Sequence, residues 1–390
     1  MDSNIIFFAQ AVAEEIAAVG IPSAPEVSFW DHWAVWLVLR VIFGVAALAV
    51  IMCFAAVGVV LERKVCGFIQ GRYGPMETNV PYIMLIPVVG KILQRLGLQQ
   101  LIADALKFLL KEEPLPNHVD KFWYNAAPVM SLAPVLISAC FIPFGYFVLD
   151  GERIPLSPTD VDFSLLLVLI LGSLGVYGAV MAGWASNNKY SYLGGVRATA
   201  QMISYELTML LAIVPMLMWI APYIDNPFSL FEIGLYQGGF WNCFAFPLSA
   251  FLFLIALFAE TNRQPFDMAE SEADLVGGFH TDYGAFKFGL FFVGEYGHMA
   301  LGSALFVTLF LGAWSPLPGL VWPESWGWIA TVLGFVTFLV KIFAMMFLFV
   351  WVRWTLPRFR YDHVMNLGWS KLLPLAVLNL IFYMVLARFV

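Results

Sequence analysis

Charged residues are scarce in this chain of 390 residues, since Asp, Glu, Lys and Arg together make up only 12% of it. Apolar residues make up 61%, against about 45–50% in soluble proteins. Cysteine is also rare, and the four cysteines include no C-x-x-C pair. This pattern does not suit a zinc or iron–sulfur site, and the five histidines show no metal-ligand spacing either. We therefore expect no metal site and no redox centre in the chain.

Basic residues are absent from residues 1–33, so this N-terminal segment lacks the n-region of a secretory signal peptide. Repeated apolar runs follow, and they are long enough to cross a bilayer as helices. A membrane β-barrel is excluded, because its short strands alternate in polarity. The sequence therefore predicts an all-α integral membrane protein with a membrane domain over 34–388. Eight transmembrane helices are expected at 34–60, 126–149, 163–184, 204–224, 241–259, 286–312, 326–352 and 370–388.

Basic residues also predict the orientation in the membrane. Lys and Arg stay on the cytoplasmic side of a membrane. Fifteen of them lie in four connecting segments, whereas the segments on the opposite side hold only Arg153. We therefore expect both termini on the outer side, and four long cytoplasmic loops at 61–125, 185–203, 260–286 and 353–371.

The first cytoplasmic loop is too long for a simple connection. Apolar residues recur at helical spacing over 98–110, and basic residues lie alongside them. This pattern predicts an amphipathic helix that lies in the membrane interface. The alternative is a membrane-anchored surface helix that binds no ligand.

Acidic residues gather in 260–298, between two apolar runs. Carboxylates kept at or inside a membrane are costly, so they are candidates for function. A solvated acidic loop is the alternative for Glu272, Asp274 and Asp282. The seven carboxylates of this stretch are Glu260, Asp267, Glu270, Glu272, Asp274, Asp282 and Glu295.

Glu295 does not fit a solvated loop, because it lies inside the sixth apolar run. It is roughly 13 Å from the start of that run at a rise of 1.5 Å per residue. That depth is near the middle of a hydrocarbon core of about 30 Å. His298 shares its helix face. A lone glutamate at this depth favours proton transfer over a structural role.

Two basic residues are candidate partners for these acids. Glu260 ends the fifth run, and Arg263 is near enough along the helix to pair with it. Lys341 lies inside the seventh run, where it either pairs with an acid or extends toward the interface.

Glycines shape the stretch 61–75, which reads LERKVCGFIQGRYGP. Gly71 and Gly74 predict a sharp turn that brings Arg72 back toward the bilayer. An arginine so placed could hold an anionic surface or a polar ligand head. The charges at 62–64 predict ordinary interface anchors.

The connection between the third and fourth runs contains Gly194-Gly195, which predict a close turn. Arg197 follows on the first helical turn, and Glu206 lies near the cytoplasmic end of the fourth run. A buried carboxylate there suits a proton relay. The alternative is a Glu–Arg pair that locks the end of the helix.

Several of these stretches resemble a known family. They are ERKVCGFIQGRYGP, IADALKFLLKE, GGVRATAQMISYE, AETNRQPFDMAESEADLVGGF and FFVGEYGHM. In this order they resemble the quinone-site membrane subunit of respiratory complex I, called the H subunit in bacteria and subunit 1 in mitochondria. The resemblance covers residues 34 to 388.

The resemblance implies a membrane subunit of a proton-pumping NADH:quinone oxidoreductase. Its cytoplasmic loops would form the quinone chamber with the peripheral arm, and buried carboxylates would couple quinone reduction to proton translocation. The proton route would comprise Glu206, Glu260, Glu270, Glu272, Glu295, Asp274 and Asp282. The quinone-binding residues would be Arg72, Arg197, Arg263 and Phe266.

The resemblance also implies partners and location. Quinone would be the substrate, and the flavin and iron–sulfur clusters would belong to partner subunits. Those partners would be peripheral-arm subunits, small membrane subunits and antiporter-like subunits, together with membrane lipids but no nucleic acid. We expect a bacterial inner membrane, with the mitochondrial inner membrane as the alternative.

The chain departs from the family pattern after Pro75, where some fifteen extra residues precede Gly97, and Leu101 stands where the family usually has proline. Two other functions compete with the favoured one. A proton- or cation-coupled secondary transporter would use the same buried acids to bind its driving ion. The homologous subunit of a membrane-bound hydrogenase, or of a related dehydrogenase, would look similar but serve a different electron donor.

Overall fold

The computed structural model describes residues 29–78, 87–113, 115–149, 152–323 and 326–389. Most of the predicted outer-side segment 1–33 lies outside these residues, as does part of the inserted segment before Gly97. The chain divides into two compact units, Met1–Ile42 and Phe43–Val390. All contacts described below are within the second unit.

The protein is almost entirely helical, as predicted. Its long helices are α2 (Phe29–Ile69), α5 (Lys121–Ala139), α6 (Ser164–Ala185), α7 (Lys189–Ile220), α12 (Ala285–Phe310) and α13 (Trp328–Thr355). The shorter elements are α3 (Pro87–Leu96), α4 (Leu98–Leu110), β1 (Tyr146–Leu149), β2 (Glu152–Pro155), α8 (Leu230–Tyr236), α9 (Asn242–Ala245), α10 (Pro247–Glu260), α11 (Glu272–Leu275), η2 (Gly278–His280), α14 (Tyr361–Asn366), η4 (Leu367–Leu372) and α15 (Leu373–Leu386).

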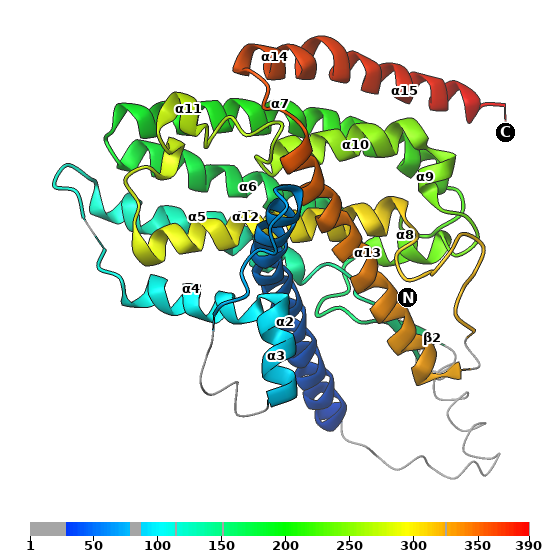
Figure 1. The fold of residues 1–390 in the computed structure, drawn as a ribbon. Helices are drawn as coiled ribbons and strands as arrows, with labels where there is room; N and C mark the ends of the chain where they lie inside the picture. The colour runs from blue at the N-terminus through cyan, green and yellow to red at the C-terminus, as the bar shows by residue number, and fades with distance from the viewer. Residues whose placement is uncertain (1–28, 79–86, 114, 150–151, 324–325, 390) are drawn as a thin grey trace, which may run out of the picture. The chain divides into compact units, whose positions relative to one another are not determined.

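Seven helices of the described residues are long and apolar enough to cross a membrane. They include the continuous helical stretch from α14 to α15, and this confirms an integral membrane protein. The fifth predicted span corresponds to α10, which is apolar but has only 14 residues. Helices α5, α6, α7, α10 and α12 run side by side, and α13 crosses them (Figure 1).

Three predicted boundaries are wrong. Helix α5 ends at Ala139 instead of 149, because Pro143 and Gly145 interrupt the apolar run and the antiparallel hairpin β1–β2 follows. The last cytoplasmic connection is short, because helical structure resumes at Tyr361 rather than at 370. The third difference concerns α7.

The turn predicted at Gly194-Gly195 is wrong, because α7 is helical from Lys189 onward. These glycines instead allow close packing. A Cβ on Gly194 would lie 2.6 Å from the backbone nitrogen of Phe279, in the loop that carries the acidic residues. Gly194 therefore allows this loop to lie directly against α7.

Gly194→Ala should push the acidic loop away from α7, because the added methyl group has no space. Overpacking of this kind costs about 1–3 kcal/mol. We expect a lower temperature of half-inactivation for quinone reductase activity in the purified assembly. Gly239→Ala is the matched control, since a Cβ there meets nothing within 4 Å. Equal effects of both substitutions would contradict this packing role.

Lys341 has neither of the partners predicted for it. Its ammonium group donates hydrogen bonds to the carbonyl oxygens of Leu311, Ala313 and Ser315, at 2.6, 3.1 and 2.6 Å. These carbonyls follow the C-terminal end of α12, where a helix leaves acceptors unsatisfied and favours a cation. Lys341 therefore caps the helix that carries Glu295.

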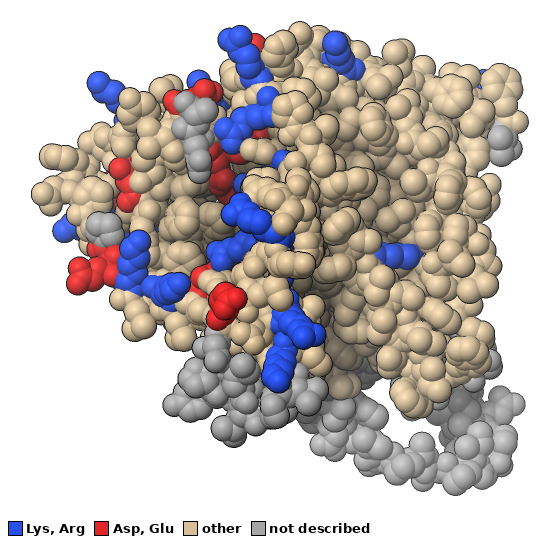
Figure 2. All heavy atoms as spheres, in the orientation of Figure 1, with Lys and Arg blue, Asp and Glu red and all other residues tan. Residues whose placement is uncertain are grey.

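Charged side chains are distributed unevenly over the molecule. They gather toward the side of the visible face where α4 and α11 lie, and the opposite side is almost bare of them (Figure 2). Two-sided asymmetry of this kind is expected for a membrane protein whose polar loops gather on one side.

Candidate functional site

Arg263 is at the centre of a buried charged cluster. It follows the end of α10 by three residues and is only 4% exposed. Its guanidinium lies 3.2 Å from Glu62 and 4.0 Å from Glu295, and 4.2 Å from the ring centre of Tyr296. The predicted pairing with Glu260 is therefore wrong. The helix ends before Arg263, which directs the side chain toward α2 and α12 instead.

Glu62 is a buried member of this cluster, so its predicted role as an interface anchor is wrong. Helix α2 continues to Ile69, which places Glu62 two turns inside the helix. Its carboxylate also pairs with Arg353 at 2.8 Å and accepts a hydrogen bond from the Tyr296 hydroxyl. Residues from α2, α12 and α13 thus meet the loop after α10 at one carboxylate.

Glu270 approaches the same cluster from the acidic loop. It lies 3.7 Å from His280 and interacts with Glu295. Burial alone would raise the pKa of Glu270, but the hydrogen bond from Glu295 and the charges of His280 and Arg263 lower it. Glu270 and Glu295 therefore form a carboxylate pair in which Glu270 is the group that favours ionisation.

Burial affects Arg263 differently. It alone would lower the pKa of the guanidinium, but Tyr296, Glu62 and the two acids of the carboxylate pair raise that pKa above its usual value. Arg263 therefore remains cationic whatever the protonation of its neighbours, and it can stabilise a negative charge on any of them.

Asp267 was not among the predicted site residues, yet it is buried beside this cluster. Burial and the nearby charge of Glu270 raise its pKa, while Arg358, whose guanidinium lies 2.6 Å away, opposes the shift. Arg358 also donates to the Ser271 hydroxyl at 3.0 Å. The pair attaches the acidic loop to the segment between α13 and α14.

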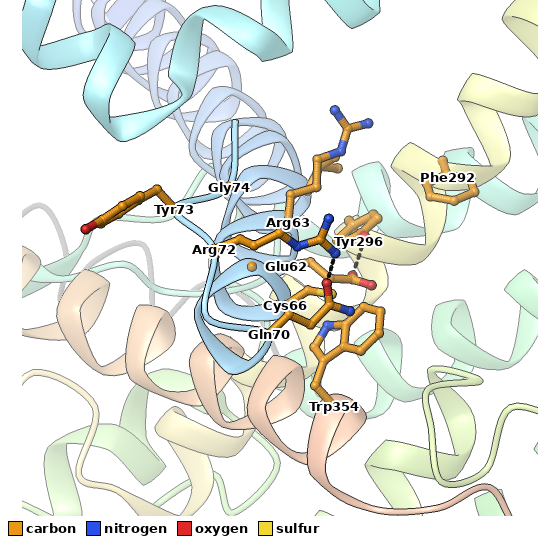
Figure 3. Close-up of a pocket in the computed structure, with 12 residues that line it drawn as sticks. Glu62, Arg63, Cys66, Gln70, Arg72, Tyr73, Gly74, Phe292, Tyr296 and Trp354 are labelled. Carbon is orange, nitrogen blue, oxygen red and sulfur yellow. Dashed lines mark hydrogen bonds between the residues drawn. The ribbon is translucent and has the colours of Figure 1, made fainter. Parts of the chain in front are cut away.

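A cavity of about 630 Å³ opens beside Glu62. Its wall comes from the end of α2, the turn after it, α12 and α13 (Figure 3). The predicted turn is confirmed, since Gly71 and Gly74 both adopt a φ of +72°. It brings Arg72 to the cavity, where its guanidinium donates to Gln70. Aromatic side chains complete the wall, namely Tyr73, Phe292, Tyr296 and Trp354.

Glu260 and His298 form a second buried pair. Their side chains approach to 3.5 Å, between Nε2 of His298 and Oε1 of Glu260. A cavity of about 40 Å³ connects this pair with Glu295, since all three side chains line it. His298 was noted in the sequence only for sharing a face with Glu295, and its partner on another helix could not be seen there.

Glu206 lies in the middle of α7 rather than at a helix end, because α7 begins at Lys189. It accepts a hydrogen bond from the Ser173 hydroxyl on α6. None of the ion pairs found among the described residues involves Glu206, so the Glu–Arg lock receives no support. A cavity of about 20 Å³ lies one turn away at Met209 and also touches Glu260 and His298.

The other predicted residues lie nearer the surface or in the core. Asp274 is 61% exposed and lies 3.6 Å from Arg197. Asp282 accepts hydrogen bonds from Asn188 and Ser191 at the start of α7. Phe266 is packed between Tyr205 and Phe359. The side chain of Glu272 lies outside the described residues.

The helix predicted over 98–110 is present as α4. Its apolar side chains Ile102, Leu106, Leu109 and Leu110 are exposed, as a helix in the membrane interface requires. It is joined to α2 by an ion pair between Arg63 and Asp104 at 2.5 Å. Across the described residues, no three or more His, Cys, Asp or Glu side chains are grouped to hold a metal.

Comparison with known proteins gives a consistent result. A family model described as NADH dehydrogenase matches residues 42–384. The NADH-quinone oxidoreductase H subunit of Flavobacterium psychrophilum is 42% identical over 340 residues, or 86% of this chain and 93% of the relative. An H subunit of Koribacter versatilis, the second of that name, is 41% identical over 92% of this chain and 98% of the relative. The H subunit of Leptospira biflexa is 43% identical over 83% of this chain and 88% of the relative. The chain therefore belongs to the family of NADH-quinone oxidoreductase H subunits, which are membrane subunits of complex I.

Proposed function

We propose that this chain forms the quinone-binding chamber of complex I together with the peripheral arm, and couples quinone reduction to proton translocation. One observation carries the proposal. Glu62 lines the large cavity and is ion-paired with Arg263, which faces Glu295 and Glu270 in the membrane domain. A single carboxylate thus borders both the ligand cavity and the buried acids.

The cavity has the size and chemistry that a quinone head needs. Small-molecule sites are about 300–1,000 Å³ and are lined by aromatic groups with a few polar ones. The rings of Phe292, Tyr296 and Trp354 supply planar apolar surface, and Arg72 supplies hydrogen-bond donors for a carbonyl oxygen. Among the other predicted quinone residues, Arg263 lies behind this wall, and Arg197 and Phe266 would act through the loops that they hold.

The buried acids support a proton route. From Glu62 the charged cluster leads to Glu295 and Glu270, then through the small cavity to Glu260. Glu206 lies farther along, in the middle of α7. Carboxylates in these positions can take up and release protons without any exposure to water. Asp274, Asp282 and Glu272 belong to the entry side of this route in our proposal.

Charge at this site would respond to quinone chemistry. Reduction of a quinone places negative charge on its oxygens before protons arrive, and Glu62 and Arg263 lie next to the cavity where this occurs. A change in the charge balance at Glu62 would alter how strongly Arg263 stabilises Glu295. This links the redox step to proton affinity in the membrane.

We further propose eight membrane spans, with α10 as the eighth, both termini on the outer side, and a bacterial inner membrane as the location. The bias of Lys and Arg toward four loops supports this orientation. Flavin and iron–sulfur clusters would lie in partner subunits of the peripheral arm, and antiporter-like and small membrane subunits would continue the proton path. Family membership favours this function over a secondary transporter.

Cys66→Trp tests the quinone part of the proposal. Cys66 lines the cavity, and a tryptophan there would fill much of it. We expect the KM for quinone to rise by about tenfold or more, because that corresponds to about 1.4 kcal/mol of lost binding. Electron transfer from NADH to an artificial acceptor that accepts electrons upstream of quinone should not change.

Cys53→Trp is the matched control, because Cys53 lies on the same helix and is exposed to the surroundings of the protein. It should leave the KM for quinone unchanged. A Cys66→Trp enzyme with wild-type KM and intact assembly would show that quinone binds elsewhere.

A further inference from the structure

His298 occupies a position between two groups of buried acids. It lies on α12 one turn beyond Glu295, and its side chain is only 12% exposed. It lines the cavity of about 40 Å³ together with Glu295 and Glu260. It also lines the cavity of about 20 Å³ next to Met209, on the helix that carries Glu206.

The two edges of the imidazole face different places. Nε2 is 3.5 Å from Oε1 of Glu260, close enough for an ion pair but longer than a normal hydrogen bond. On the other edge, the Cβ position of Gly175 on α6 lies 4.0 Å from Nδ1. Gly175 itself lines the cavity shared with Glu295. One nitrogen thus faces Glu260, and the other is at the wall of the Glu295 cavity.

Glycines on α6 provide the space for this ring. The Cβ positions of Gly172 and Gly175 lie 3.9 and 3.8 Å from its Cε1 atom, so side chains there would occupy the space into which the ring can rotate. The elements packed around it otherwise contribute the polar groups Ser131, Thr261 and Asn262, and the acids Glu260 and Glu295. Among the described lining residues these two acids are the titratable partners of His298.

We infer that His298 is a proton-transfer residue that connects Glu295 with Glu260. An imidazole can accept a proton at one nitrogen and release another from the second, so one proton enters and one leaves. The cavity of about 40 Å³ exceeds the 10–15 Å³ of probe volume that one water needs, and its polar lining can hold that water between Glu295 and the ring. Rotation of the ring in the space beside Gly172 would restore the starting tautomer.

This inference rests on the proposed proton route, and it deepens that route by one residue. Carboxylates alone leave a gap between Glu295 and Glu260, because each lines the shared cavity without contacting the other in the described structure. His298 is the side chain that borders both the cavity and Glu260. It therefore converts two separate acids into neighbours along one path.

His298→Asn in the assembled complex, reconstituted in proteoliposomes, tests this role. Asparagine keeps a polar side chain of similar width but cannot carry a proton from one atom to another. We expect coupled turnover and the initial rate of proton pumping to fall about tenfold, since a positioned proton-transfer group contributes at least that much. The solvent isotope effect on turnover should rise, because proton transfer becomes rate-limiting. A purely structural role would not raise it.

Ser303→Ala is the control, because Ser303 is buried on the same helix and only contacts the Met299 carbonyl. If His298→Asn does not assemble, His298→Gln replaces it, since its amide is long enough to reach Glu260. Wild-type turnover, pumping and isotope effect in the assembled variant would overturn the inference. If Glu295→Gln in parallel abolishes pumping, the proton route stands and only the role of His298 fails. If Glu295→Gln also pumps normally, both fail.

Discussion

Replacing Glu295 by glutamine should abolish proton pumping while the complex still assembles. Gln keeps the shape of the side chain and can donate a hydrogen bond to Glu270, as the carboxylic acid does. It cannot bind or release a proton. Because Glu295 joins the charged cluster around Arg263 to the cavity shared with Glu260, no other described acid could replace it at that point.

The expected size of the effect is large. Loss of a positioned proton-transfer group typically costs about 10²–10⁴-fold. We expect quinone-dependent NADH oxidation and dye-detected proton uptake into proteoliposomes to fall at least about tenfold together. Reduction of an artificial acceptor upstream of quinone should remain at the wild-type rate, which shows that the peripheral arm is intact.

Glu112→Gln is the matched control, since Glu112 is an exposed carboxylate in the loop after α4. It should pump normally. Normal pumping by the assembled Glu295→Gln complex would exclude Glu295 from the proton route, and the path would then have to be sought through Glu206 and Glu260 alone. Turnover without pumping would be the opposite result, and would place Glu295 after the quinone step.

Local sequence patterns predicted the helices and the depth of their polar residues well. Apolar runs mark membrane helices because each must cover a fixed thickness of hydrocarbon, so Glu295 was correctly expected inside a span. The turn at Gly71 and Gly74 was predictable for a similar reason, since a left-handed backbone favours glycine whatever surrounds it.

Partners distant in the chain were not predictable. Glu62 and Arg263 are 201 positions apart, and nothing near either residue specifies the other. Glu62 looked like an interface anchor because the end of α2 was placed too early. Gly194-Gly195 looked like a turn because glycine also serves close helix packing, and the sequence does not say which use applies. Lys341 similarly finds three carbonyls whose positions depend on where α12 ends.

Arg263→Leu should have the largest effect on stability. The guanidinium is buried and faces Glu62 and the Glu270–Glu295 pair. Removing one partner of a buried ion pair costs about 3–5 kcal/mol, because the remaining charge stays buried without compensation. Glu62 would keep Arg353 as a partner, but no other arginine lies near enough to form an ion pair with Glu295 in the described residues. We expect less assembled complex, and a fall of roughly 5–10 °C in its temperature of half-inactivation.

The double variant Arg263→Leu with Glu295→Gln separates the charge effect from a simple loss of packing. Gln carries no charge, so the double variant should recover part of the assembly and thermal stability that Arg263→Leu loses, although it should not pump. Arg360→Leu is the control, because Arg360 is 82% exposed and its pairing with Asp362 at 3.9 Å contributes little. If Arg263→Leu is as stable as wild type, or if the second substitution restores nothing, then the acids do not depend on this arginine. Recovery of stability without pumping would instead show that Arg263 holds a charge in the membrane that the proton route requires.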